Sequence, residues 1–336
     1  QKTVAGFNKN VSKSILIRGL ISAIVLLIFL IYVKRRCGIS GIEMFTSYKR
    51  CEHSPIKGLY RLILEEEGVN LEQDLEKFDL YYPCGYNKIE KELKSLTLKD
   101  YQNVFGICGC DTIASKSSLW KTLENYYGRE KAREFMPESY ILRNDEQLEN
   151  FKRIFDTSRT YILKKNIQRK KGIKISNNLN EIVKARNDKY VLVQEKIDSL
   201  VINKRRMNLR IYLVIKCREG IKELYMHDNA KCLYTSKDID ESNLNSGTPE
   251  EFESLITNSY ITELTIYNTN PLTLNQLCDY VEEHYQIPKE QFMLSIEENL
   301  KNVFTAMLPK LCNCDNIHKN GQFQLFGADV ILDKEL

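Results

Sequence analysis

Residues 205–215, RRMNLRIYLVI, decide how the rest of the chain is interpreted. The β-branched and apolar second half of this stretch predicts a central strand of a sheet. Because successive side chains of a strand point to opposite faces, Arg206, Asn208 and Arg210 share one face. A covered guanidinium needs an anion close by. The alternative is a strand with one solvent-exposed face, and the surrounding sequence has to distinguish the two.

Similar short segments surround this stretch. Strands are predicted over 159–165, 189–197, 208–216 and 221–227, and a closing strand begins near Gln322. Helices are predicted over 117–136, where Ser117 or Ser118 can cap the first turn, and over 146–156, 273–284 and 289–308. Strands followed by two helices and a further strand indicate an α+β domain.

The composition places the chain among folded proteins. Hydrophobic residues make up 43% and charged residues 28% of the 336 positions, and the net charge is +4. Residues 151–210 hold 17 Lys and Arg against 5 Asp and Glu, an excess of 12 positive charges. Such an excess is either a solvated face or a surface for polyanions. The basic residues are not interleaved with aromatic residues in a recognisable module, so we expect no nucleic-acid partner.

The amino end predicts a membrane anchor. Residues 14–33, SILIRGLISAIVLLIFLIYV, are apolar over about the length that crosses a bilayer. The basic triplet at 34–36 favours a single-pass membrane protein with a cytosolic catalytic region. A cleaved signal peptide is the competing interpretation. The predicted division is a tail (1–13), an anchor (14–33), a juxtamembrane segment (34–77), a small mixed domain (78–150) and the main domain (151–336).

Ten cysteines occur at irregular intervals, which is typical of a reduced, intracellular protein. The C-x-C pairs Cys108/Cys110 and Cys312/Cys314 are too closely spaced for the usual structural zinc site. Buried free thiols are the prediction at these positions.

Polar residues follow the predicted strands where a nucleotide could use them. Lys164 ends a strand and precedes a basic loop that includes Gly172, a combination that suits phosphate groups. Asp329 lies inside the apolar closing stretch FQLFGADVILD (323–333), where its carboxylate suits Mg²⁺. The alternatives are surface lysines beside a glycine, and an aspartate in a salt bridge.

Five segments in order resemble the tubulin–tyrosine ligase-like family of ATP-grasp ligases. They are YILKKNIQRKKGI (161–173), VLVQEKI (191–197), NLRIYLVI (208–215), ITN (256–258) and FQLFGADVILD (323–333). The resemblance covers roughly 119–336 and implies an ATP-grasp-like domain. Enzymes of this family use ATP and Mg²⁺ to activate a carboxylate as an acyl phosphate, which an amine then converts to an amide.

The resemblance also implies roles for individual residues. Lys164, Lys171 and Gly172 would hold the nucleotide phosphates, and Gln194, Glu195 and Ile197 would line the adenine pocket. Arg206 and Asn208 would lie near the ribose and the substrate, Arg210 would stabilise the transferring phosphoryl group, Asn258 would lie near the substrate, and Asp329 would bind the metal.

The chain departs from the family pattern at several points. The family often has Lys and Asp where this chain has Arg206 and Asn208, and its phosphate loop has more glycine than the single Gly172 found here. The family's next strand, which ends in Glu-x-Asn and completes the metal site, would follow Leu336. We therefore expect the sequence to be a fragment of a longer reading frame, with a C-terminally truncated ATP-grasp-like domain that is poorly active by itself.

Together these features predict a membrane-anchored ligase that adds Tyr, Glu or Gly to a protein carboxylate, with ATP and Mg²⁺ as cofactors. A free amino acid and an acidic protein, such as a tubulin tail, would be its substrates. One alternative is a catalytically inactive, membrane-tethered ATP-grasp-like scaffold. Another is a luminal type II membrane transferase, for which the sequence DID (238–240) is a candidate metal motif without supporting features.

Overall fold

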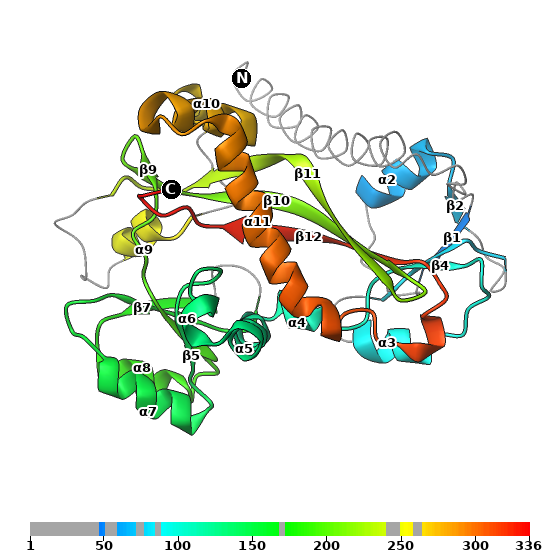
Figure 1. The fold of residues 1–336 in the computed structure, drawn as a ribbon, viewed down its shortest axis with the longest axis horizontal. Helices are drawn as coiled ribbons and strands as arrows, with labels where there is room; N and C mark the ends of the chain where they lie inside the picture. Colours follow the sequence, from blue (N-terminus) through cyan, green and yellow to red (C-terminus); the bar gives the residue numbers. More distant parts are fainter. Residues whose placement is uncertain are drawn as a thin grey trace, which may run out of the picture. The chain divides into compact units, whose positions relative to one another are not determined.

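The computed structural model describes residues 47–50, 59–71, 77–84, 89–167, 172–239, 249–257 and 264–336. Figure 1 shows the ribbon of the chain and the labels of its helices and strands. The chain divides into two compact units, which are described separately. Unit 1 contains the chain up to Cys108 together with Lys216–Ile221 and Cys312–Gln324. Unit 2 contains Gly109–Ile215, Lys222–Leu311 and Leu325–Leu336.

Unit 1 is built on parallel strands. In the order β12–β4–β3–β1–β2, these are the first three residues of β12 (Gln322–Val330), β4 (Asn103–Phe105), β3 (Leu80–Tyr82), β1 (Ser47–Arg50) and β2 (Asn70–Leu71). Helices α2 (Leu59–Glu66) and α3 (Ile89–Ser95) and the short helix η6 (Asp315–Ile317) complete the unit. Tyr48, Leu80 and Tyr82 are buried in its core, as expected for strands covered on both faces.

Among the described residues, Cys108, Cys217, Cys312 and Cys314 form two disulfides that connect distant segments of unit 1. Cys108 is bonded to Cys314, and Cys217 is bonded to Cys312. The prediction of free thiols in the two C-x-C pairs was therefore wrong for three of their four members, and only Cys110 of the two pairs is free. A backbone hydrogen bond holds the two C-x-C segments close together, since the Cys312 N–H donates to the Cys108 carbonyl over 2.7 Å. Spacing along the chain carries no information about such a long-range pairing.

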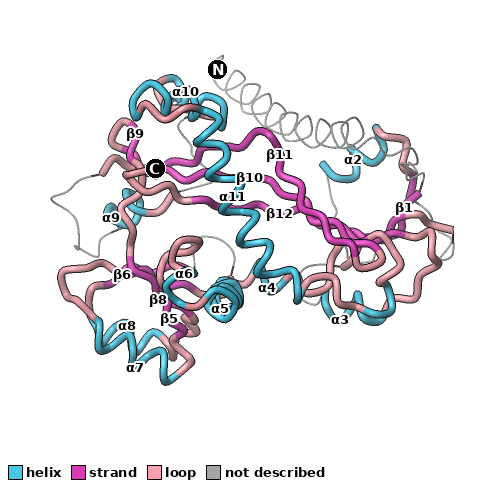
Figure 2. Tube along the Cα trace, viewed as in Figure 1, coloured by secondary structure: helices cyan, strands magenta, loops and turns pink. Residues whose placement is uncertain are grey.

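Unit 2 contains a small antiparallel sheet of four strands in the order β5–β8–β6–β7. These are β5 (Ser139–Ile141), β8 (Leu192–Glu195), β6 (Tyr161–Lys164) and β7 (Ile173–Ser176). Helices α7 (Asp145–Ile154) and α8 (Leu179–Ala185) cover one face of this sheet (Figure 2). Tyr161, Leu163 and Val193 are buried beneath them, so the alternate side chains of β6 lie on the opposite face.

The second layer of unit 2 is formed by the long strands β10 (Arg205–Arg218), β11 (Ile221–Tyr234) and β12, with β9 (Val201–Ile202) paired to β10. The two-residue turn between β10 and β11 has positive φ at Glu219 and Gly220, the geometry of a tight hairpin. Helices α10 (Leu274–Tyr285) and α11 (Lys289–Met307) bury their apolar faces against Leu209, Ile211 and Cys232 of this layer (Figure 1).

The remaining elements of unit 2 are short. They are α4 (Asp111–Ala114), α5 (Lys116–Tyr127), α6 (Arg129–Ala132), α9 (Pro249–Leu255), η4 (Leu264–Asn268) and η5 (Leu308–Lys310). Helix α5 begins earlier than predicted, with Ser115 at its N-cap rather than Ser117 or Ser118. The mixture of sheets and helices agrees with the predicted α+β class.

Within the described part of the chain, no helix is both long and apolar enough to cross a membrane. This finding contradicts the predicted single-pass membrane localisation and does not support the transmembrane helix in the predicted fold. The stretch 14–33 itself lies outside the described residues.

Candidate functional site

Lys164 ends strand β6 on the sheet face opposite to α7 and α8. The pKa of Lys164 is lowered to about 8, mainly by burial and then by the ammonium group of Lys116, whereas the Asp329 carboxylate opposes the shift. Burial without a full counter-charge makes the protonated form costly. An anion that binds beside Lys164 would remove this cost.

Lys116, the first residue of α5, was not identified from the sequence. Its Nζ donates hydrogen bonds to the backbone carbonyls of Lys165 (3.1 Å) and Ile167 (2.9 Å). Burial lowers the pKa of Lys116, and Asp329 raises it. Lys116 thus brings a second cation beside the end of β6. No local pattern in the sequence indicated this, because the residue is 48 positions away from Lys164.

Arg210 and Asp329 form a two-pronged ion pair between β10 and β12. The distances are 2.6 Å from Nε to Oδ1 and 3.0 Å from Nη2 to Oδ2. Burial lowers the pKa of Arg210, but its bond to Asp329 outweighs burial and the net shift is upward. Gly327 leaves room for the pair, since a Cβ there would lie 3.1 Å from Cδ of Arg210. The Asp329 carboxylate also acts on Lys116, whose pKa its negative charge raises.

Arg206 and Asn208 are buried on the strand face opposite to the core residues Met207 and Leu209. Arg206 donates from Nη1 to the Ser199 hydroxyl over 3.3 Å. Its Nε and the Oδ1 of Asn208 are buried without a hydrogen-bond partner. One unpaired donor and one unpaired acceptor on the same strand face are what a ligand with both kinds of group would satisfy.

Further charges surround Arg206. Burial lowers its pKa, and the Asp198 carboxylate opposes this effect. Burial also lowers the pKa of Lys196, as does the charge of Arg206, while Asp198 and Glu251 raise it. The positive charges of Arg206 and Lys196 are therefore only partly balanced by the nearby carboxylates.

The residues expected to line an adenine pocket separate into two groups. Glu195 and Ile197 line a cavity of about 500 Å³ and Glu195 accepts a 2.8 Å hydrogen bond from Arg159. Gln194 is instead buried on β8, where its amide nitrogen donates to the hydroxyl of Ser139 (2.6 Å), its register partner on β5. The full lining of the cavity is Arg133, Pro137, Glu138, Arg159, Glu195, Lys196, Ile197, Asp198, Asp333, Lys334 and Glu335.

Gly172 lies where the chain returns to the sheet as β7. Its carbonyl accepts a 2.8 Å hydrogen bond from the Lys165 N–H, and a Cβ on it would lie 2.6 Å from Cγ1 of Ile167. Gly172 therefore has a close-approach role in the described structure, whatever its part in binding phosphate. Lys171 and Asn258, the other predicted residues, lie outside the described residues.

The arrangement fits a nucleotide. Two cations with lowered pKa, Lys164 and Lys116, share one region with Arg210, and the unpaired polar atoms of Arg206 and Asn208 lie on the same strand face as Arg210. ATP would place phosphates by the lysines and hydroxyl groups by the unpaired atoms.

The fit to Mg²⁺ is incomplete in the described residues. Asp329 offers one carboxylate, and Arg210 already occupies both of its oxygens. Within the described ranges, one other group of three ligand-type side chains lies close together, Glu90, Cys108 and Cys314 of unit 1, but the disulfide between its two cysteines leaves no free thiolate for a metal. A metal at Asp329 would need that ion pair to open.

Comparison with known proteins supports the resemblance. The family model described as "Tubulin-tyrosine ligase family" matches residues 93–336. No curated protein matches the chain.

Proposed function

Because the chain belongs to the tubulin-tyrosine ligase family, we propose that it is part of an ATP-dependent ligase that joins the amine of a free amino acid to a protein carboxylate. The family's members generally are ATP-dependent carboxylate–amine ligases that use Mg²⁺. The amino acid is tyrosine, glutamate or glycine. The acceptor is an acidic protein, such as a tubulin tail, which suits the excess of 12 positive charges over 151–210.

The observation that carries this proposal is the convergence of cations around Asp329. Lys164, Lys116 and Arg210 come from β6, α5 and β10, and all three are coupled to this one carboxylate. A site for phosphoryl transfer requires such positioned charge more than it requires covalent chemistry.

ATP, when bound, supplies the γ-phosphoryl group that activates the acceptor carboxylate as an acyl phosphate. The overall change joins one amine nitrogen to one carboxyl carbon, and it releases ADP, inorganic phosphate and a proton. Lys164 and Lys116 would neutralise charge on the phosphates, and a bound anion favours their protonated forms. Arg210, once released from Asp329, would hold the transferring group.

The test is a ligation assay on the full-length protein. Radiolabelled tyrosine, glutamate and glycine are each incubated with ATP, Mg²⁺ and either tubulin or an acidic peptide. Label in the acceptor that depends on ATP supports the proposal. Tight ATP binding without label from any of the three amino acids would reject ligase activity.

A second candidate is a non-catalytic scaffold that retains the ATP-grasp-like shell. The closed Arg210–Asp329 pair favours it, because both carboxylate oxygens are occupied by the guanidinium. The same assay separates the candidates, since a scaffold binds nucleotide and forms no amide.

A further inference from the structure

A second cavity of unit 2 lies away from the site described above. It measures about 530 Å³ and is named here the back cavity, defined by its lining residues Lys165, Lys174, Asn187, Asp188, Lys189 and Tyr190. In the sheet, Lys174 is the register partner of Leu163, whose side chain is buried beneath α7 and α8. Paired residues share a face, so Lys174 points to the side opposite to Lys164.

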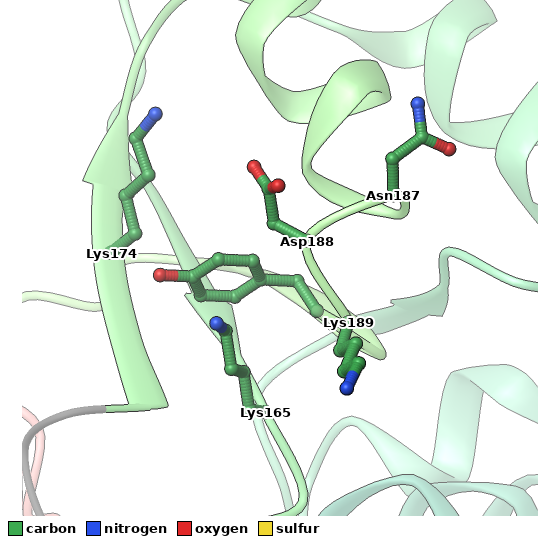
Figure 3. A pocket seen from close by; sticks show the side chains of 6 residues that line it. Lys165, Lys174, Asn187, Asp188 and Lys189 are labelled. Atoms are coloured by element: carbon green, nitrogen blue, oxygen red, sulfur yellow. The ribbon is translucent and has the colours of Figure 1, made fainter.

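Figure 3 shows how separate elements bring these side chains together: Lys174 on its strand, Lys165 beyond the end of β6, and Asn187, Asp188 and Lys189 on the segment after α8. That segment is a compact turn. The N–H groups of Asp188 (3.0 Å) and Tyr190 (3.2 Å) donate to the Ala185 carbonyl. Lys189 has φ 66°, so the chain reverses there and returns to the sheet.

The charges of the back cavity are only partly balanced. Nζ of Lys165 lies 4.5 Å from the centre of the Tyr190 ring, a cation–π contact that leaves its charge intact. Nζ of Lys174 lies 3.0 Å from the Glu181 carboxylate, which is outside the lining. Counting Lys165, Lys174 and Lys189 against Asp188 and Glu181 leaves an excess of one positive charge.

We propose that the back cavity binds carboxylate groups of an acidic protein segment, with glutamate side chains accepting hydrogen bonds from Lys165 and Lys174. An excess of one charge matches a group with a single negative charge. A carboxylate and a nucleic-acid phosphodiester each carry one negative charge, and Asp188 would repel both. A nucleic acid is the poorer match because Lys165 covers a face of the Tyr190 ring that a stacking base would need.

This site goes beyond the proposed ligase activity, because it lies on the other face of the small sheet from Lys164. It would hold an acidic protein without contacting the reacting groups. Its existence can therefore be tested without turnover, and absence of ligase activity would leave it standing.

The experiment measures fluorescence anisotropy of a dye-labelled decaglutamate peptide titrated with the 336-residue chain. The Lys165→Gln/Lys174→Gln variant should bind the peptide about tenfold more weakly than the unchanged chain, and added salt should narrow this difference. The matched control is Lys121→Gln/Lys301→Gln, which removes two exposed lysines outside the cavity. It should bind as the unchanged chain does, and a decaglutamine peptide should not bind.

Lys189→Gly gives an independent variant, since glycine accepts the positive φ of this position while the charge is removed. This variant should bind the peptide about threefold more weakly than the unchanged chain. All cavity variants should keep the ATP affinity of the unchanged chain. Equal peptide affinity in the Lys165/Lys174 variant and its control would overturn the proposal. So would an oligothymidylate that binds more tightly than the peptide through the same two lysines.

Discussion

The ammonium group of Lys164 is buried on the face of the small sheet opposite to α7 and α8, and Lys116 provides a second cation nearby. The pKa of Lys164 is about 8 in the folded chain and lies below the ordinary 10.5 of a lysine. Between these two values the unfolded chain binds more protons than the folded chain, so this residue makes stability rise with pH across that window. At pH 7 the protonated group opposes folding.

Replacing Lys164 with Met should therefore raise the melting temperature of the nucleotide-free chain at pH 7, or leave it unchanged. The rise in stability from about pH 8 to 10.5 should become smaller than in the unchanged chain, because the contribution of Lys164 is lost while those of Lys116 and Lys196 remain. Thermal unfolding at several pH values checks this. An unaltered pH slope would show that Lys164 titrates normally in the folded chain.

The Arg210–Asp329 pair makes a second residue-scale prediction. Its side chains are 31% and 48% exposed, so water screens much of the attraction. A double-mutant cycle with Arg210→Gln and Asp329→Asn should give a coupling free energy of about 0.5–1 kcal/mol in urea unfolding. Two additive single effects would mean that the pair is not formed in solution.

At the scale of elements, Gly109 precedes α4 in a position that only glycine can occupy. It has φ +82°, and an added Cβ would lie 1.9 Å from the backbone oxygen of Lys310. Gly109→Ala should lower the free energy of unfolding by about 3 kcal/mol or more, through backbone strain and a steric clash that backbone cannot relieve.

Gly128 provides the matched control for this change. It has φ +78° and ψ 162°, a conformation that strains any other residue, but no atom lies within 4 Å of an added Cβ, so Gly128→Ala should cost about 1–3 kcal/mol, from backbone strain alone. Chemical denaturation of both variants gives the comparison. Similar losses in the two variants would contradict the close approach between Gly109 and Lys310.

The strongly apolar strands and the helices with a repeating apolar stripe could be predicted from the sequence, whereas the short elements of mixed polarity could not. The helices predicted over 273–284 and 289–308 nearly match the observed bounds of α10 and α11. Strand β7 and helix α8 have 4 and 7 residues, too few for a pattern to repeat. The back cavity was missed for this reason, because both elements contribute to building it.

At the scale of the whole molecule, contacts distant in sequence account for what remained unpredicted. Lys164, Arg210 and Asp329 were identified because each interrupts or ends an apolar strand. Lys116 interrupts no such strand, and its role appears only through its bonds to the carbonyls of Lys165 and Ile167. Disulfide connectivity is likewise a property of the folded chain.

The disulfides make a prediction at this scale. Cys217–Cys312 closes a segment of 95 residues, so the Cys217→Ala/Cys312→Ala variant should lose about 2–4 kcal/mol of stability under oxidising conditions. Under reducing conditions the difference from the unchanged chain should shrink to the small cost of lost packing. Equal differences in both conditions would show that these two thiols are not bonded.

The central claim is that Lys164 and its neighbouring cations bind the phosphates of a nucleotide. The most direct measurement is the dissociation constant of ATP and of adenosine for the unchanged chain and for Lys164→Met, by isothermal titration calorimetry. ATP should bind the variant about thirtyfold more weakly than the unchanged chain, whereas adenosine should bind both equally. An ATP affinity that does not change, or a parallel loss of ATP and adenosine, would contradict the central claim.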